Sequence, residues 1–196
     1  MFYLCCLPRD EAGPARVCFF VNRRIDHKRW QVTEHSRDIS SLTIEVSEER
    51  GVKQSLTIHN VYNPTQNSTS SRTTLVDVRA IVSKYQMNEQ VLLGDFNLHH
   101  PMWGGPRIRY TDPESEDLIA IMEDYELSNT LLPGTITYKE RTAQSTIDLC
   151  IVTVGLVDRV IQSQVDQDLD HDSDHLPIST VLDITAQKLE PTTRKN

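Results

Sequence analysis

Apolar residues along the chain follow two different spacings, which predict strands and helices respectively. Strict alternation, as at Leu42, Ile44 and Val46, is typical of a strand with one buried face. Short runs of β-branched and aromatic residues that end at turn residues also predict strands. On these grounds we predict strands within residues 16–22, 41–49, 55–64, 91–93, 135–139, 145–153, 157–165 and 175–185.

Two segments have helical periodicity instead. In the first, apolar residues recur at helical spacing from Leu75 to Tyr85. The second, residues 113–127, begins with Pro113 and acidic residues, which is how helices commonly start. Many strands with few helices between them favour an α/β protein with a mixed or antiparallel sheet.

The length of the chain suits a single domain. Its 196 residues, 38% of them apolar, are sufficient for one core, which we place in residues 1–185, with a polar tail at 186–196. The first eleven residues are apolar but too few for a membrane helix, and they lack the positive segment of a signal peptide. We therefore expect an intracellular protein with reduced cysteines and no membrane partner.

The net charge of −8 argues against a broad basic surface for nucleic acid. It does not exclude a nuclease, because a metal site is itself built from carboxylates and a bound cation changes the local charge. Charge alone therefore leaves nucleic-acid chemistry open.

Asp95 and Asn97 follow directly after the apolar run 91–93. Such a run reads as a buried strand, and ligands bind at the rim of open α/β sheets. Residues two apart on a strand point to the same face, so both side chains can enter one pocket.

A second group of polar residues occurs towards the C-terminus. Asp148 interrupts an otherwise apolar strand, and buried carboxylates need a partner. His175, at the end of the acidic stretch 170–175, is a natural partner, whose tautomer a carboxylate would fix. The alternatives are a salt bridge from Asp148 to an arginine, and a solvated acidic turn at 170–175.

The histidines of "NLHHPMWGG" invite comparison with a zinc site. Neighbouring residues of an extended segment point apart, and a catalytic zinc normally needs three ligands, so we expect His99 and His100 to be loop or substrate-contact residues. Trp103 is expected either to pack the loop or to stack on a base.

Taken in order, "NVYNP", "GDFNLHHPMWGG", "STIDL" and "SDHLPI" resemble motifs of the endonuclease/exonuclease/phosphatase superfamily, to which deoxyribonuclease I belongs. Within it the chain is most similar to the endonuclease domains of LINE-type (non-LTR) retrotransposons. The resemblance covers about residues 16–185. It implies a two-sheet α/β sandwich that binds Mg²⁺ or Mn²⁺ and hydrolyses DNA phosphodiester bonds, and hence a nuclear location.

The resemblance also implies roles for individual residues. Asp95 would orient or deprotonate the attacking water, and His175, paired with Asp148, would contact the scissile phosphate. Asp174 and Asp95 would hold the metal. The implied contacts to water, phosphate or substrate are Asn97, Tyr62, Thr137, His99 and Trp103.

One departure from the family pattern affects the expected activity. The family has an early strand with an Asn and a second strand ending in a metal-ligating Glu, and neither motif occurs here; Glu11 is the nearest early acid. We expect a truncated domain with impaired nicking activity and exposed strand edges that favour self-association. A catalytically inactive remnant and a phosphatase of the same superfamily are the alternatives.

Overall fold

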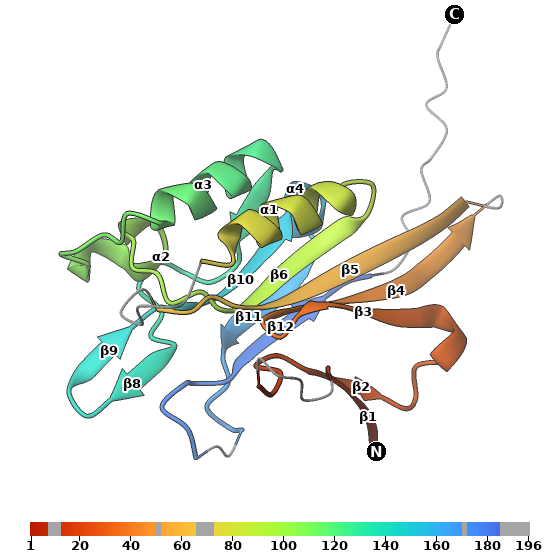
Figure 1. Cartoon of the computed structure of the whole chain (residues 1–196), viewed down its shortest axis with the longest axis horizontal. Helices are drawn as coiled ribbons and strands as arrows, with labels where there is room; N and C mark the ends of the chain where they lie inside the picture. Colours follow the sequence, from red (N-terminus) through yellow and green to blue (C-terminus); the bar gives the residue numbers. More distant parts are fainter. Residues whose placement is uncertain (8–12, 50–51, 66–72, 170–171, 185–196) are drawn as a thin grey trace, which may run out of the picture.

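The computed structural model describes residues 1–7, 13–49, 52–65, 73–169 and 172–184, and its centre is a six-stranded sheet (Figure 1). The strands lie in the order β3, β4, β5, β6, β10, β7. β5 and β6 run parallel, whereas the other neighbouring pairs are antiparallel, which confirms the predicted mixed sheet. The strands are β3 (Trp30–Ser36), β4 (Ile39–Glu49), β5 (Val52–Tyr62), β6 (Glu89–Asp95), β10 (Asp148–Thr153) and β7 (Leu127–Asn129).

Two helices, α1 (Leu75–Lys84) and α3 (Ser115–Asp124), cover one face of this sheet (Figure 1). Their buried apolar residues pack with those of β5, β6 and β10 in the largest core cluster. Both helices were predicted, α1 from its periodicity and α3 from the proline and acidic residues at its start. The second ends earlier than predicted because Glu126 has a φ of 51° and Leu127 starts β7.

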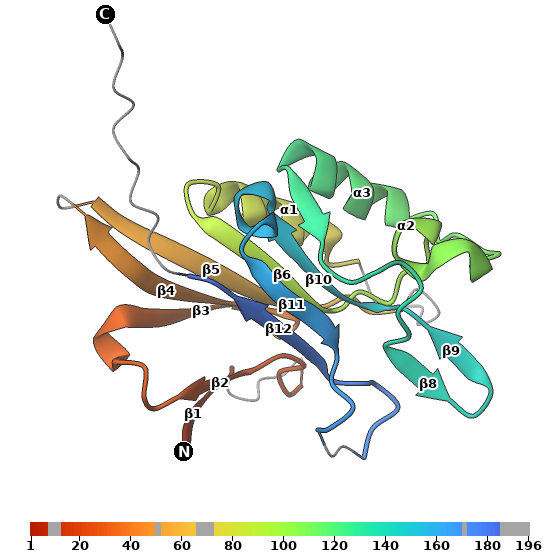
Figure 2. The ribbon, with the colours of Figure 1, turned by 180° about the vertical axis from the view of Figure 1, so that it is seen from behind.

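Two separate two-stranded ribbons lie on the opposite face of the sheet (Figure 2). One consists of β1 (Phe2–Cys5) and β2 (Phe19–Asn22), the other of β11 (Val160–Val165) and β12 (Ile178–Leu182). Ile58 on β5 packs against the core clusters of both ribbons. In the ranges that the structure describes, neither ribbon pairs with a further strand, so each has open edges.

The remaining elements are short. They are α2 (Pro101–Gly104), α4 (Val154–Val157), the 3-10 turns η1 (His27–Arg29) and η2 (Gly105–Arg107), and a hairpin of β8 (Tyr138–Glu140) and β9 (Ala143–Ser145). Sequence patterns missed β1, β3, β7, α2 and α4, and they predicted one strand over 145–153 where the structure has the end of β9 and all of β10. No helix in the described part of the chain is long and apolar enough to cross a membrane.

A buried polar chain crosses the sheet next to α1. His59 on β5 is 1% exposed, and its Nδ1 lies 2.7 Å from Ser41 Oγ while its Nε2 lies 2.9 Å from Gln90 Oε1. Because the Gln90 oxygen only accepts, Nε2 must donate, and Nδ1 then accepts from the Ser41 hydroxyl. Burial lowers the pKa of His59 to about 4, so the ring is neutral in the native protein.

Candidate active site

Three strands bring polar residues together at one end of the central sheet. Asp95 is the last residue of β6, and it pairs with Tyr62 on β5 and with Asp148 on β10. The end of a strand leaves its side chains at the rim, where they can reach a ligand. This convergence puts the polar clusters predicted at the ends of separate strands side by side.

Gly94 makes the close approach of β5 and β6 possible at this rim. Its φ is +134°, and a Cβ atom at this position would lie 1.9 Å from the carbonyl oxygen of Val61. Only glycine adopts such a backbone without strain. Gly94 therefore fixes how Asp95 leaves the sheet.

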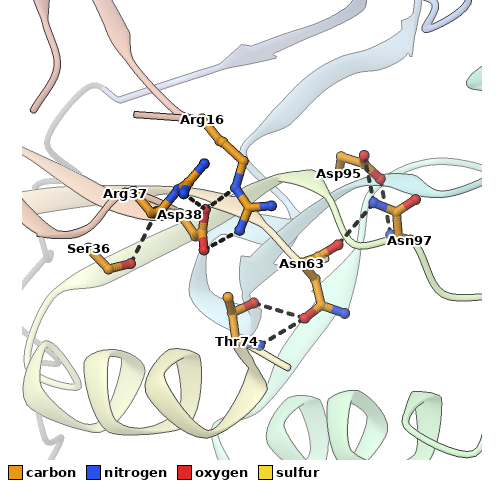
Figure 3. A network of polar contacts seen from close by, with 8 residues as sticks. All are labelled: Arg16, Ser36, Arg37, Asp38, Asn63, Thr74, Asp95 and Asn97. Atoms are coloured by element: carbon orange, nitrogen blue, oxygen red, sulfur yellow. Dashed lines mark hydrogen bonds and ion pairs between the residues drawn. The ribbon is translucent and has the colours of Figure 1, made fainter. Parts of the chain in front are cut away.

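Asn97 holds the carboxylate of Asp95 in a defined orientation. The backbone N–H of Asn97 donates to Asp95 Oδ1 over 3.0 Å, and the side-chain Nδ2 of Asn97 donates to Asp95 Oδ2 over 2.8 Å. Nδ2 also donates to the carbonyl oxygen of Asn63, whose own side chain accepts from Thr74 at the start of α1 (Figure 3). Asn63 is fully buried, so it ties the rim rigidly to the helix layer.

The hydrogen bond predicted between His175 and Asp148 is present. His175 Nδ1 lies 3.0 Å from both carboxylate oxygens of Asp148, which fixes the ring and leaves Nε2 for another partner. Burial raises the pKa of Asp148, and the neighbouring His175 opposes this increase. Tyr138 packs edge-on against the His175 ring, with 4.9 Å between the ring centroids, and supports it from the other side.

The pKa of Asp95 is raised to about 6, chiefly because the carboxyl group is buried and secondly because Asp148 is close to it. His175 and the two hydrogen bonds from Asn97 act in the opposite direction. A carboxylate with this pKa accepts a proton more readily than an ordinary aspartate, which suits a general base near neutral pH.

These residues open onto a cleft of about 590 Å³. Six predicted site residues line it, namely Tyr62, Asp95, Asn97, His99, Asp174 and His175. A slightly larger cleft, about 640 Å³, lies around Glu89 at the opposite end of β6. We take the cleft of about 590 Å³ as the candidate site, because the predicted site residues line it.

A second histidine–carboxylate pair lies at the same cleft. Asp112 Oδ2 is 3.0 Å from His99 Nδ1 and accepts from the His99 backbone N–H over 2.6 Å. The Asp112 backbone N–H in turn donates to the His99 carbonyl oxygen over 3.0 Å. Sequence reasoning missed Asp112, because its position before Pro113 indicated only the start of a helix.

The structure corrects two predicted substrate contacts. Trp103 is 0% exposed and packs in the core, with Nε1 donating to the carbonyl oxygen of Leu98, so it cannot stack on a base. Thr137 is also fully buried, and its hydroxyl accepts from the backbone N–H groups of Ile147 and Asp148. Thr137 positions the start of β10 instead of contacting a phosphate.

Sequence reasoning also missed Arg16, which borders the site through Tyr62. Its guanidinium carbon lies 4.3 Å from the centroid of the Tyr62 ring, and its side chain forms an ion pair with Asp38 (Figure 3). Nothing in the local pattern indicated this contact, since Arg16 precedes an apolar strand. Glu11, Asp170 and His171, and the predicted tail 186–196, lie outside the described residues.

The carboxylates of the cleft suit a cation that keeps most of its water ligands better than one coordinated mainly by protein side chains. Asp95 and Asp174 both line the cleft, but no cluster of three or more His, Cys, Asp or Glu side chains that could hold an ion occurs in the described ranges. Mg²⁺ is commonly held by one or two carboxylates and keeps several waters. The pair therefore fits a magnesium ion bound largely through water.

A family model described as "Endonuclease-reverse transcriptase" matches residues 56–179, which is more than half of the chain. The chain belongs to this family. The endonuclease-reverse transcriptase match contains Tyr62, Asp95, Asp148 and His175, and the fold is that of the deoxyribonuclease I-like endonuclease/exonuclease/phosphatase superfamily. Among curated proteins, no sequence matches this member of the family.

Several solved structures share the fold of this endonuclease-reverse transcriptase family member. The endonuclease domain of TRAS1, a telomere-specific non-LTR retrotransposon, has a TM-score of 0.68 at 17% identity, over 92% of this chain and 80% of that domain. A 3′ phosphatase from Neisseria bound to a product DNA hairpin has a TM-score of 0.54 at 19% identity, over 76% of this chain and 66% of its own. The catalytic domain of Xenopus laevis APE2 has a TM-score of 0.56 at 15% identity, over 74% and 55%. At these identities the likeness shows the fold alone.

Proposed function

We propose that this domain is a DNA-nicking endonuclease of retrotransposon origin, which hydrolyses phosphodiester bonds with the help of a divalent cation. The observation that carries the proposal is the arrangement of Asp95 beside the hydrogen-bonded pair of His175 and Asp148. Hydrolysis of a phosphodiester needs a base for the attacking water and donors for the charge that develops on the phosphate. The family match and the TRAS1 neighbour support the same reaction class.

In this proposal Asp95 holds the attacking water and accepts its proton. Asn97 keeps the carboxylate oriented for this step. His175 donates from Nε2 to a phosphate oxygen, while Asp148 holds the opposite side of the ring. Tyr62 lines the cleft with them and contacts the phosphate.

Asp95 and Asp174 are the residues that would hold Mg²⁺ or Mn²⁺. When bound, such an ion neutralises charge on the phosphate and is worth several kcal/mol of barrier. No glutamate is among the residues that line the cleft in the described part of the chain. We therefore expect weak activity, because two carboxylates must retain a strongly hydrated ion with little further help.

A plasmid-nicking assay tests the proposed function. Supercoiled DNA is incubated with the domain in Mg²⁺, Mn²⁺ or EDTA, and conversion to the open circle is followed. We expect slow nicking that EDTA abolishes and that His175→Ala reduces by roughly a hundredfold or more. Nicking that is unchanged in His175→Ala would refute the site, and hydrolysis of a small phosphomonoester without nicking would favour a phosphatase.

We also infer that the domain self-associates through its two ribbons. Both ribbons have open edges in the described residues, and unpaired strand edges are templates for pairing with another chain. Their outer faces also carry exposed apolar side chains, including Phe20 and Ile161.

A further inference from the structure

We propose that His99 is the general acid that protonates the leaving oxygen of the cleaved phosphodiester, with Asp112 as its positioning residue. This inference rests on the proposed function, and it goes beyond the substrate contact predicted for His99. In this scheme Asp95 and His175 act on the attacking water and the phosphate, and the pair of His99 and Asp112 acts on the leaving oxygen.

The first support is the orientation of the His99 ring. Asp112 accepts from both the backbone and the ring of His99, and the Asp112 backbone N–H donates back to His99, so three hydrogen bonds join the two residues. With Nδ1 bonded to a carboxylate, the proton stays on Nδ1, and Nε2 is the nitrogen left for the cleft. These three hydrogen bonds hold the His99 ring in one orientation.

The second support is the position of His99 relative to Asp95. Asp95, Asn97 and His99 all line the same cleft, while Phe96 and Leu98 between them are buried. The His99 side chain is 40% exposed, so a substrate in the cleft can reach it. His100, the next residue, does not line this cleft, and its Nδ1 instead accepts from the Met102 backbone N–H at the start of α2.

The third support is that Asp112 is itself anchored. Its carbonyl oxygen accepts from the backbone N–H and the hydroxyl of Ser115 at the start of α3. Ser115 is fully buried, and the loop between His99 and Asp112 is held by buried Trp103. The ring of His99 is therefore fixed by the helix layer, as a proton donor for a defined atom requires.

The chemistry balances without a further reactant. The water oxygen forms a bond to phosphorus while Asp95 takes one proton from that water. The bond from phosphorus to the leaving oxygen breaks, and this oxygen takes the Nε2 proton of the His99 imidazolium. The products are an alcohol and a phosphomonoester, and solvent returns the proton to His99 and removes one from Asp95.

A substrate whose leaving atom is sulfur tests this assignment directly. A thiolate leaves without protonation, so a bridging phosphorothiolate does not need a general acid. The strand ends produced by the wild-type domain identify the leaving oxygen, and a duplex with sulfur at that one position is compared with the ordinary duplex. Single-turnover cleavage is measured in Mn²⁺, which tolerates sulfur better than Mg²⁺.

We expect His99→Ala to cleave the ordinary duplex roughly a hundredfold more slowly than the wild type, or slower still, and to approach the wild-type rate on the sulfur duplex. Asp112→Asn should show a smaller loss with the same rescue. His175→Ala should be slow on both substrates, because His175 acts on the phosphate. His100→Asn, which keeps an acceptor at the start of α2, should match the wild type on both.

Three results would overturn the assignment. His99→Ala that is equally slow on both duplexes while its melting temperature is unchanged would make His99 a substrate contact. His99→Ala that equals the wild type on the ordinary duplex would remove it from the reaction. An inactive wild-type domain would refute the proposed function and this inference with it, whereas the first two results leave the proposed function intact.

Discussion

Asp95 is half-buried at the edge of a cleft, where its carboxyl group is partly removed from water but still open to a ligand. Its two hydrogen bonds from Asn97 favour the ionised form, but burial and Asp148 outweigh them and raise the pKa to about 6. The native fold is therefore less stable when Asp95 is ionised than it would be without the charge. The position of the ionised Asp95 carboxylate in the candidate site therefore lowers the stability of the fold.

In EDTA, the stability of Asp95→Asn relative to the wild type is expected to be about 1 to 2 kcal/mol more favourable at pH 7.5 than at pH 4, after discounting for solvent screening. The unfolded chain ionises this group near the ordinary pKa of 3.8, and the folded one near 6. The wild type therefore loses stability as the pH rises from about 4 through 6, and the variant does not. Thermal melts at pH 4 and 7.5 check this. An advantage that is equal at both values would contradict it.

His59 should produce the opposite pH dependence. Its pKa is about 4 in the folded protein and 6.5 ordinarily, so the unfolded state binds the proton first as the pH falls. The wild type loses up to about 3 kcal/mol between pH 6.5 and 4 from this group. His59→Gln should lower stability at pH 7 through lost packing, but it should flatten the loss on acidification.

Denaturant unfolding at several pH values measures this effect of His59. His27→Gln is measured in parallel as the control, since His27 is exposed and lies outside the buried polar chain. A His59→Gln profile as steep as that of the wild type would assign the acid sensitivity to other groups.

At the scale of elements, the end of β6 depends on one glycine. Gly94→Ala would force a Cβ atom against the Val61 carbonyl and strain a backbone at φ +134°. We expect a loss of about 3 kcal/mol or more, since the clash is with main chain and cannot be relieved by a side-chain movement. Nicking should be lost as well, because Asp95 is the next residue.

Gly134→Ala is the matched control for Gly94→Ala. Gly134 also has a positive φ, +89°, but a Cβ atom there would meet only the Gly104 carbonyl oxygen at 3.7 Å. The expected loss is on the order of 1 kcal/mol. Chemical denaturation of both variants provides the comparison, and equal losses would show that the approach of β5 to β6 is more adaptable than the structure implies.

The elements that sequence predicted best are those whose burial is one-sided. The periodicity of α1 appears directly in the residue pattern, because its buried residues form one face against the core. The alternation of Leu42, Ile44 and Val46 predicted β4, although the start of this strand is buried on both faces. β3 was missed because "WQVTEHS" alternates weakly and is mostly half-buried. α2 was missed because four residues are too few for a period, and a glycine-rich and proline-rich stretch predicts a loop.

Most residue types of the candidate site, and the pairing of His175 with Asp148, were predictable from the sequence. Strand-end polar residues indicated Asp95, Asn97, Asp148 and His175, and the structure brings them together. His99 and Asp112 are thirteen positions apart and meet only because the loop between them folds back, which no local sequence pattern predicts. Trp103 follows the packing alternative, whereas Thr137 was misplaced because its burial depends on neighbours distant in sequence.

For the whole molecule, the layer formed by the two ribbons is the part most open to association. Phe20 is 66% exposed and Leu4, its partner across the β1–β2 ribbon, is 59% exposed. A wild-type domain that self-associates through this face should elute earlier from a sizing column as its concentration rises. Phe20→Lys with Leu4→Lys should shift the elution towards the monomer.

The same double variant should retain nicking, because neither residue lines the cleft. Met87→Lys is the control, since Met87 is 92% exposed but follows α1 on the helix side. A concentration-independent monomer for the wild type would refute association through the ribbons. Equal shifts for the double variant and the control would point to net charge as the cause.

The pairing of β6 with β10 sets the order in which the protein can become active. β3, β4 and β5 pair through short connections, whereas Asp95 meets Asp148 only after the chain has passed through α2, α3 and the β8–β9 hairpin. Contacts between distant residues form late, because closing a long loop costs entropy before any contact rewards it. His175 joins later still in the sequence, from beyond β11. A chain emerging from the ribosome would thus bury much of its sheet before Asp95, Asp148 and His175 meet, so the candidate site would be completed only in the last steps of folding.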